Sequence, residues 1–251
     1  MSSSNPPMLA ETHWRIALAL SETLNLEDSD VGLLADGSLA PDTWGSFPHH
    51  TNKDREIASR IIEARRLLDS GNPQYMFSLG VAAHYIEDRW TSIIRGLADH
   101  HLWEKNVESS QILDNLQLKS EIIKTAPQEK VAGVYLALIN DLERDRIPPT
   151  SSTAAALRRY RERLGSTVSR TRHSSSYDQS TTVARRRERD DLEYLSDPSG
   201  RSSASRNTDF CVKAVSYALV DRPSQWSSPL LDLNMAYRVC LEVVKSIMSI
   251  I

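Results

Sequence analysis

The histidines and carboxylates of the first hundred residues are the part of this sequence best suited to chemistry. Six of the seven histidines lie between residues 13 and 101, where acidic residues stand at helical or turn spacing from them. His84 and Asp88 are four residues apart, so on a helix their side chains project from one face, one turn apart. His100 and Glu104 repeat this spacing. Because imidazole and carboxylate are ligands that zinc accepts, the pattern predicts a metal centre.

Other segments supply further ligands of the same kind. His13 lies on the first predicted helix, and Asp42 precedes the adjacent pair His49 and His50. A single His-Asp pair is also typical of hydrogen-bonded core residues, but the concentration of such residues in several segments favours a metal. A carboxylate can bridge two metals about 3.5–4 Å apart. The candidate ligands are therefore His13, Asp42, His49, His50, His84, Asp88, His100 and Glu104.

Helices must position these residues, because apolar side chains recur at helical spacing and no strand alternation persists. The Gly71-Asn72-Pro73 run ends one predicted helix, and the segment after it is apolar enough to be buried on most sides. Residues 25–52, with Asp36-Gly37 and Pro41-Asp42, are predicted to form a loop. We expect an all-α fold with helices over residues 8–24, 53–70, 74–95, 103–124, 128–144, 208–220 and 230–251.

The composition changes after residue 146. Residues 147–206 are rich in Ser, Thr and Arg and poor in large aliphatic side chains, so they cannot bury much apolar surface. We therefore predict a helical metal-binding core over residues 8–146 and a partly disordered, Ser/Arg-rich insertion over 147–206. The C-terminal helices of residues 207–251 are expected to pack on the core.

Charge is distributed unevenly along a chain whose net charge is only −3. Residues 1–150 carry 14 basic and 22 acidic side chains, a net of −8, and the remainder carries +5. Within residues 158–189, ten arginines stand against three acids, so this stretch could contact an anionic surface; the alternative is a solvated flexible segment.

Cys211 and Cys240 make no disulfide framework, and we expect both to be small buried hydrophobes. The N-terminus lacks a secretory signal pattern, and no stretch reaches the ~18 apolar residues of a transmembrane helix. The sequence therefore predicts a cytoplasmic protein, and nothing in it specifies an oligomeric state.

Four segments resemble the zinc-dependent phospholipase C family, which is related to the plant and fungal single-strand-specific zinc nucleases. They are THWRIALAL (12–20), GSLAPDTWGSFPHH (37–50), SLGVAAHYIEDRWT (78–91) and HHLWE (100–104). The resemblance implies an all-helical bundle that holds up to three zinc ions in a cleft. It matches His13 to an early histidine of the family, Asp42 to a loop aspartate, and either His49 or His50 to the histidine that follows.

The resemblance also implies roles for the helical pairs. Asp88, four residues after His84, matches the aspartate that bridges two zinc ions, and His100 with Glu104 matches a late pair on the separate zinc. The family has a further histidine six residues after the aspartate, where this chain has Ile94. We therefore expect two zinc ions. A third zinc ion requires His100 or His101 to replace the histidine that is missing at Ile94. The pair of His100 and Glu104 would then not have the role given above.

The function predicted from these features is zinc-dependent hydrolysis of a phosphodiester by a metal-activated water, with Asp42 as ligand and general base. A phospholipid is preferred to nucleic acid as substrate because the first 150 residues are acidic. The alternatives are a nuclease of the same fold and a non-catalytic interaction module with a degenerate metal site. A different helical phosphohydrolase of the HD type is disfavoured, since the chain has no His-Asp dipeptide.

Overall fold

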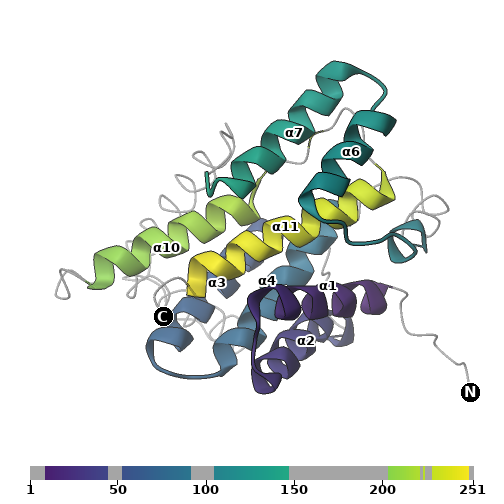
Figure 1. Ribbon diagram of the computed structural model, residues 1–251. Coiled ribbons are helices and arrows are strands. Elements are labelled where there is room, and N and C mark those ends of the chain that lie inside the picture. The colour runs from purple at the N-terminus through teal and green to yellow at the C-terminus, as the bar shows by residue number, and fades with distance from the viewer. Residues whose placement is uncertain are drawn as a thin grey trace, which may run out of the picture.

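Every regular element of the described chain is a helix (Figure 1). The computed structural model describes residues 9–44, 53–91, 105–146, 203–220, 223 and 228–248. The predicted all-α class is confirmed for these residues, whereas the phospholipase C type of bundle stays a prediction. None of the described helices is both long and apolar enough to cross a membrane.

The first four helices follow one another closely along the chain, and four more come after residue 114. The N-terminal four are α1 (Leu9–Leu24), α2 (Asp28–Thr43), α3 (Lys53–Asp69) and α4 (Gln74–Thr91). The later four are α6 (Asn115–Thr125), α7 (Glu129–Glu143), α10 (Ser203–Ala218) and α11 (Pro229–Met248).

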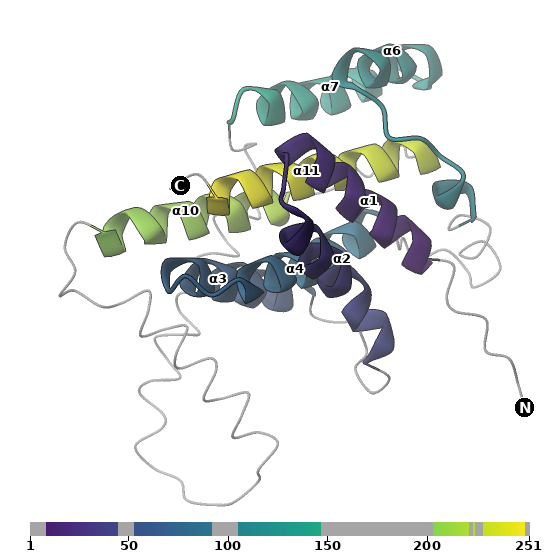
Figure 2. The same ribbon diagram turned by 60° about the horizontal axis from the view of Figure 1, so that its bottom comes forward.

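Helix α4 lies at the centre of the arrangement. It is flanked by α2 and α3, and α11 packs across it (Figure 1). Figure 2 shows α2, α3 and α4 in one layer, with α10 and α11 in the next and the α6–α7 hairpin beyond them. Helix α1 packs on α2 and also contacts α4 and α11. The N-terminal helices that carry the predicted ligands therefore meet around α4.

Helix α4 is buried on nearly all sides, as its apolar composition predicts. Every residue from Tyr75 to Asp88 except Phe77 is buried. The predicted bounds of α1, α3 and α7 agree with the observed helices to within one residue. The chain leaves α3 through Gly71, whose φ of +68° is a conformation that glycine adopts without steric cost. Cys211 and Cys240 are both buried and unpaired, as expected.

The prediction of a loop over residues 25–52 is wrong for residues 28–43, which form α2. Glycine and proline were interpreted there as turn signals. Instead, Gly37 is buried where α2 touches α4, and Pro41 lies in the last turn of the helix. Acidic Asp28 and Asp30 in the first turn favour the helix through its dipole. Asp36, interpreted as a turn former, is an exposed residue of this helix.

The predicted continuous helix over residues 103–124 is also wrong, because the chain leaves the helical conformation between residues 109 and 114. Asp114 then starts α6 with a capping box that includes Gln117. Two buried side chains of α11 hold this connection. The Asn234 side chain accepts from the Leu113 N–H at 2.7 Å, and Arg238 donates to the Leu113 carbonyl at 2.8 Å.

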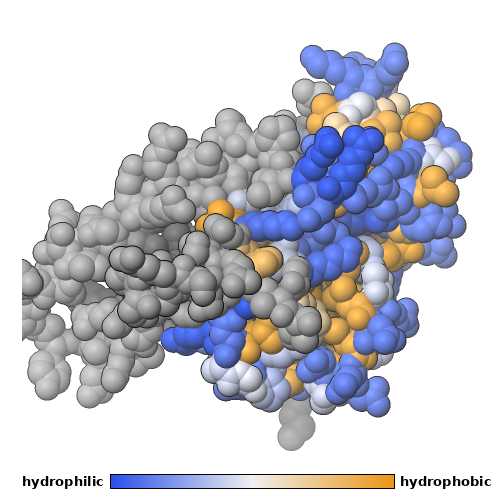
Figure 3. Space-filling model, turned by 60° about the vertical axis from the view of Figure 1, so that its left-hand side comes forward, coloured by the Kyte–Doolittle hydropathy of each residue, from blue (hydrophilic) through white to orange (hydrophobic). Residues whose placement is uncertain are grey.

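Helix α10 begins at Ser203, five residues before the helix predicted from the sequence. Residues 147–202, including the arginine-rich stretch 158–189, lie outside the described residues. Among the coloured, described residues on the face drawn in Figure 3, hydrophilic residues predominate and hydrophobic ones lie among them.

Candidate metal centre

Two turns on facing helices carry the centre. On α2, Ser38 and Asp42 are four residues apart, and on α4, His84 and Asp88 have the same spacing, so each pair lies on one helix face. The Nδ1 atom of His84 lies 2.8 Å from the carbonyl oxygen of Ser38. One turn further on, Nε2 of His84 lies 3.8 Å from Oδ1 of Asp42. Packing of α2 on α4 thus brings the Asp42 carboxylate to the His84 ring.

His13, on α1, lies beside His84 in the same centre. Its ring centroid is 4.0 Å from that of His84, with the two planes tilted by 33°. Asp88 faces the Nε2 atoms of both rings: Oδ1 is 3.8 Å from Nε2 of His13, and Oδ2 is 3.8 Å from Nε2 of His84. One ligand atom each from His13, Asp42 and His84 lies within 4.8 Å of the others, so these three residues could hold a metal ion.

The spacing of these atoms fits a metal ion. Zinc binds imidazole nitrogen and carboxylate oxygen at about 2.0–2.2 Å, which places neighbouring ligand atoms roughly 3.3 Å apart. The observed separations of 3.8 Å are only slightly longer. In addition, Oδ2 of Asp42 is buried and has no hydrogen-bond partner among the described residues. A buried oxygen of this kind is expected where a cation binds.

The protonation of His84 also favours a cation. A carbonyl oxygen only accepts, so the bond to Ser38 requires the proton on Nδ1 of His84. Burial first, and then the neighbouring His13, lower the pKa of His84 to about 4. Near pH 7 the ring is therefore neutral, and Nε2 presents a lone pair toward the oxygens of Asp42 and Asp88. A cation between the lone pair and these carboxylates would turn repulsion into attraction.

Glu87 is the functional candidate that the sequence interpretation missed. Its Oε2 lies 2.5 Å from Nδ1 of His13, and both side chains are 1% exposed. Burial, together with the negative charges of Asp88 and Asp42, raises the pKa of Glu87 well above its usual value. The sequence feature that could have identified Glu87 is an acidic residue within a helix expected to be buried on most sides. Its partner could not be found that way, since His13 is 74 residues away in the sequence.

Asp42 has the most exposed side chain of the four residues in the centre. The side chain of Asp42 is 11% exposed, whereas those of His13, His84 and Asp88 are at most 1% exposed. Trp90 is fully buried, so it belongs to the core rather than to the wall of a cleft. A catalytic metal site needs an open coordination position, and the Asp42 side is where one can be reached.

The structure brings together four of the eight predicted ligands, namely His13, Asp42, His84 and Asp88. The other four are outside the described residues: His49, His50, His100 and Glu104. Ile94, which stands where the phospholipase C family has a histidine, is outside them as well.

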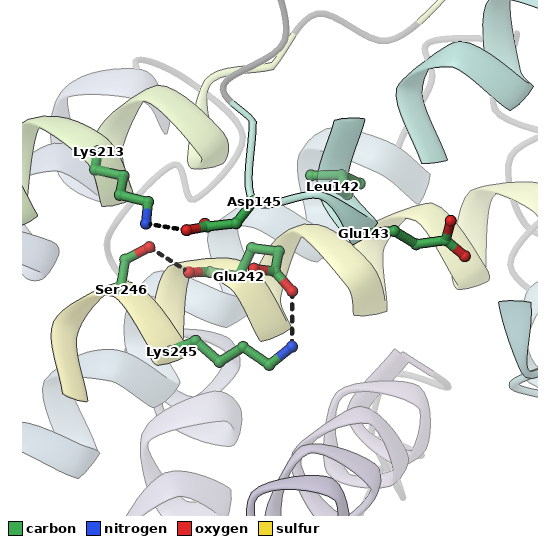
Figure 4. A pocket seen from close by; sticks show the side chains of 7 residues that line it. All are labelled: Leu142, Glu143, Asp145, Lys213, Glu242, Lys245 and Ser246. Atoms are coloured by element: carbon green, nitrogen blue, oxygen red, sulfur yellow. Dashed lines mark hydrogen bonds and ion pairs between the residues drawn. The ribbon is translucent and has the colours of Figure 1, made fainter. Parts of the chain in front are cut away.

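A pocket elsewhere in the molecule has a different character. It has a volume of about 260 Å³ and lies where α7, α10 and α11 meet (Figure 4). Four of its five charged groups pair with one another: Lys213 binds Asp145 at 2.7 Å, and Lys245 binds Glu242 at 2.8 Å. The pocket shares no residue with the metal centre and contains no histidine.

Comparisons with protein-family models, with curated proteins and with solved structures found no match for this chain.

Proposed function

We propose that this chain is a zinc-dependent phosphodiester hydrolase of the phospholipase C type. The observation that carries the proposal is the facing arrangement of two buried histidines and two carboxylates. The Nδ1 atoms of His13 and His84 are engaged by Glu87 and Ser38, so both Nε2 atoms face the carboxylate of Asp88. This is the way in which metal-binding histidines are usually oriented, with the second ring nitrogen held by a carboxylate or a carbonyl.

The mixture of ligands favours zinc over the hard cations. Magnesium and calcium select oxygen ligands, whereas two imidazoles with carboxylates suit zinc. The two oxygens of Asp88 lie near two different histidines, Oδ1 at 3.8 Å from His13 and Oδ2 at 3.8 Å from His84. This geometry supports a carboxylate that bridges two ions, and hence a centre with two zinc ions.

Zinc, when bound, would supply an activated water near neutral pH and positive charge for the phosphoryl oxygens. His84 stays neutral near pH 7 and so keeps its ligand lone pair. Asp42, at the exposed edge of the centre, is placed to accept a proton from the water. By the family resemblance, His49 or His50 would complete the first ion, and a third ion would need His100 or His101 in place of the histidine missing at Ile94.

The charge of the chain supports a phospholipid substrate. Residues 1–150 carry a net charge of −8, which repels the extended phosphate backbone of a nucleic acid. A single phosphodiester headgroup presents far less negative charge. The arginine-rich stretch 158–189 would favour an anionic surface.

Metal content and hydrolysis, measured together on the full chain, test this proposal. Purified protein should carry about two zinc ions by mass spectrometry, and it should hydrolyse phosphatidylcholine in mixed micelles faster than single-stranded DNA. Asp88→Asn should lose zinc and activity together. Asp36→Asn, the same change at an exposed position of α2, should keep both.

Three results would contradict the proposal in whole or in part. A chain that binds no zinc even when zinc is offered in excess has no such centre. A chain that binds zinc but hydrolyses neither substrate would instead be a non-catalytic module, and a preference for single-stranded DNA would make it a nuclease of the same fold.

A further inference from the structure

We propose that Glu87 is a positioning residue of the metal centre, which holds His13 by Nδ1 and so directs Nε2 of that ring toward Asp88. This inference rests on the proposed metal centre. It assigns a role to a residue that lies outside the ligand set and to which the resemblance to the phospholipase C family gives no role.

The geometry places Glu87 and Asp88 at opposite nitrogens of one ring. Neighbouring residues of a helix point about 100° apart, so adjacent carboxylates of α4 can reach two sides of the same imidazole. Oε2 of Glu87 is 2.5 Å from Nδ1 of His13, and Oδ1 of Asp88 is 3.8 Å from Nε2. A short contact thus holds the ring on one side, and on the other side the candidate ligand atoms stand 3.8 Å apart.

With Glu87 ionised, this arrangement favours the tautomer that a metal requires. When Nδ1 of His13 donates its proton to Glu87, Nε2 is left with a lone pair. Without an acceptor at Nδ1, the proton could reside on either nitrogen and the ring could turn. The negative charge of Glu87 also makes His13 a stronger electron donor toward a cation.

The cost of this position argues against a role in packing alone. A carboxylate that is 1% exposed loses its hydration, and here it also lies near the carboxylates of Asp88 and Asp42. A glutamine could satisfy the same hydrogen bond without the charge. The charge is useful where a cation occupies the centre, because the cation offsets the repulsion among the three carboxylates.

His84 provides an internal comparison, because it is held at Nδ1 by the neutral carbonyl of Ser38. Orientation of an imidazole in this fold therefore does not require a carboxylate. What Glu87 adds at His13 is charge, and a variant that removes only the charge separates the two contributions.

The test compares zinc affinity with the stability of the metal-free form for wild type, Glu87→Gln and Glu87→Ala. Zinc dissociation constants are measured on the full chain by competition with a chromophoric chelator. We expect affinity to fall about tenfold in Glu87→Gln, which keeps an acceptor, and about 100-fold in Glu87→Ala, which keeps neither charge nor acceptor. The metal-free melting temperature of Glu87→Gln should equal or exceed that of wild type, because glutamine has nearly the same shape, keeps an acceptor for His13 and removes a buried carboxyl group from beside Asp88.

Glu242→Gln is the matched control, since Glu242 is a largely buried carboxylate of α11 that lines the separate pocket of Figure 4. Its zinc affinity should equal that of wild type. Wild-type affinity in Glu87→Gln would overturn the proposal. So would a Glu87→Gln variant whose metal-free form is less stable than wild type, because Glu87 would then be needed for the fold itself.

The Glu87→Gln variant decides the matter even where Glu87→Ala does not fold. A wild-type chain that binds no zinc would overturn both the metal centre and this role of Glu87. A wild-type chain whose zinc binding is insensitive to Glu87→Gln would overturn the role alone.

Discussion

Gly37 of α2 and Gly80 of α4 face each other where the two helices touch through their backbones. A Cβ atom on Gly80 would lie 2.9 Å from Cα of Gly37 and 2.8 Å from the backbone nitrogen of Ser38. One turn beyond Gly80 on α4, the His84 ring meets the Ser38 carbonyl at 2.8 Å. The glycine pair therefore sets the approach of α2 to α4 on which the metal centre depends.

Gly80→Ala should destabilise the protein by about 3 kcal/mol, the upper part of the range for overpacking, because backbone atoms cannot move aside as a side chain can. It should also weaken zinc binding, since α2 carries Asp42. Gly32→Ala on α2 is the control: a Cβ there meets nothing within 4 Å, and helix propensity should stabilise the protein by about 0.5–1 kcal/mol. Urea unfolding measures both changes, and equal stability of the two variants would contradict the role of the glycine contact.

Asn234 should be important for the connection between residues 109 and 114. This fully buried side chain accepts from Leu113 N–H and donates to the carbonyls of Gln111 and Leu230. Asn234→Ala leaves buried backbone groups without partners, so we expect a loss of about 2–4 kcal/mol in urea unfolding and faster hydrogen exchange of the Leu113 amide. Asn106→Ala, at an exposed position before the same connection, should stay within about 0.5 kcal/mol of wild type. Unchanged exchange in Asn234→Ala would show that other contacts hold the connection.

The helices that could be predicted from the sequence are those whose apolar residues follow a local period. Helices α1, α3, α4 and α7 are of this kind. Helix α2 was missed because its structure depends on a tertiary contact. Gly37 is typical of a turn when only its neighbours in the sequence are considered, but it is buried against the backbone of α4 at Phe77 and Gly80. The break before α6 was missed for a similar reason, since Asn234, more than a hundred residues later in the chain, holds it.

The residues of the metal centre also differ in how far the sequence predicts their positions. The pairing of His84 with Asp88 could be predicted, because both residues belong to one helix and their spacing alone places them on one face. The juxtaposition of His13 and Asp42 with this pair is a tertiary contact that spacing along the chain does not give. The hydrogen bonds that orient the rings, between His13 and Glu87 and between His84 and Ser38, join residues 74 and 46 positions apart. No local pattern encodes such contacts.

Asp145 should give the protein a measurable dependence on acidic pH. Burial alone would raise its pKa, but hydrogen bonds from Lys213 and Tyr217 outweigh that effect, so the pKa of Asp145 is lowered. A carboxyl group whose pKa is lower in the folded state stabilises the fold above its unfolded pKa of about 3.9, and this stabilisation is lost as the pH falls through the folded-state pKa. Asp145→Asn should thus be less stable than wild type at pH 6, with a difference that shrinks toward pH 3.

The difference should be about 1 kcal/mol or less, because the Asp145 side chain is 60% exposed and solvent screens its charge. Thermal unfolding at several pH values measures it. Asp54→Asn, which changes another exposed aspartate that forms an ion pair with an arginine but has no tyrosine partner, serves for comparison. A gap between wild type and Asp145→Asn that persists unchanged at pH 3 would contradict the assignment.

Zinc should stabilise the fold through His84, because an ion held between α1, α2 and α4 binds only when these helices are assembled. At a free zinc concentration about 100 times the dissociation constant, the expected gain is about 2.7 kcal/mol, or roughly 5–10 °C in melting temperature for a chain of this size. His84→Ala leaves a cavity and lowers the melting temperature by itself, so the informative quantity is the zinc-induced rise within each variant. That rise should vanish in His84→Ala and persist in His173→Ala, which removes the histidine furthest along the sequence from the cluster. An equal rise in both variants would place the bound zinc elsewhere on the chain.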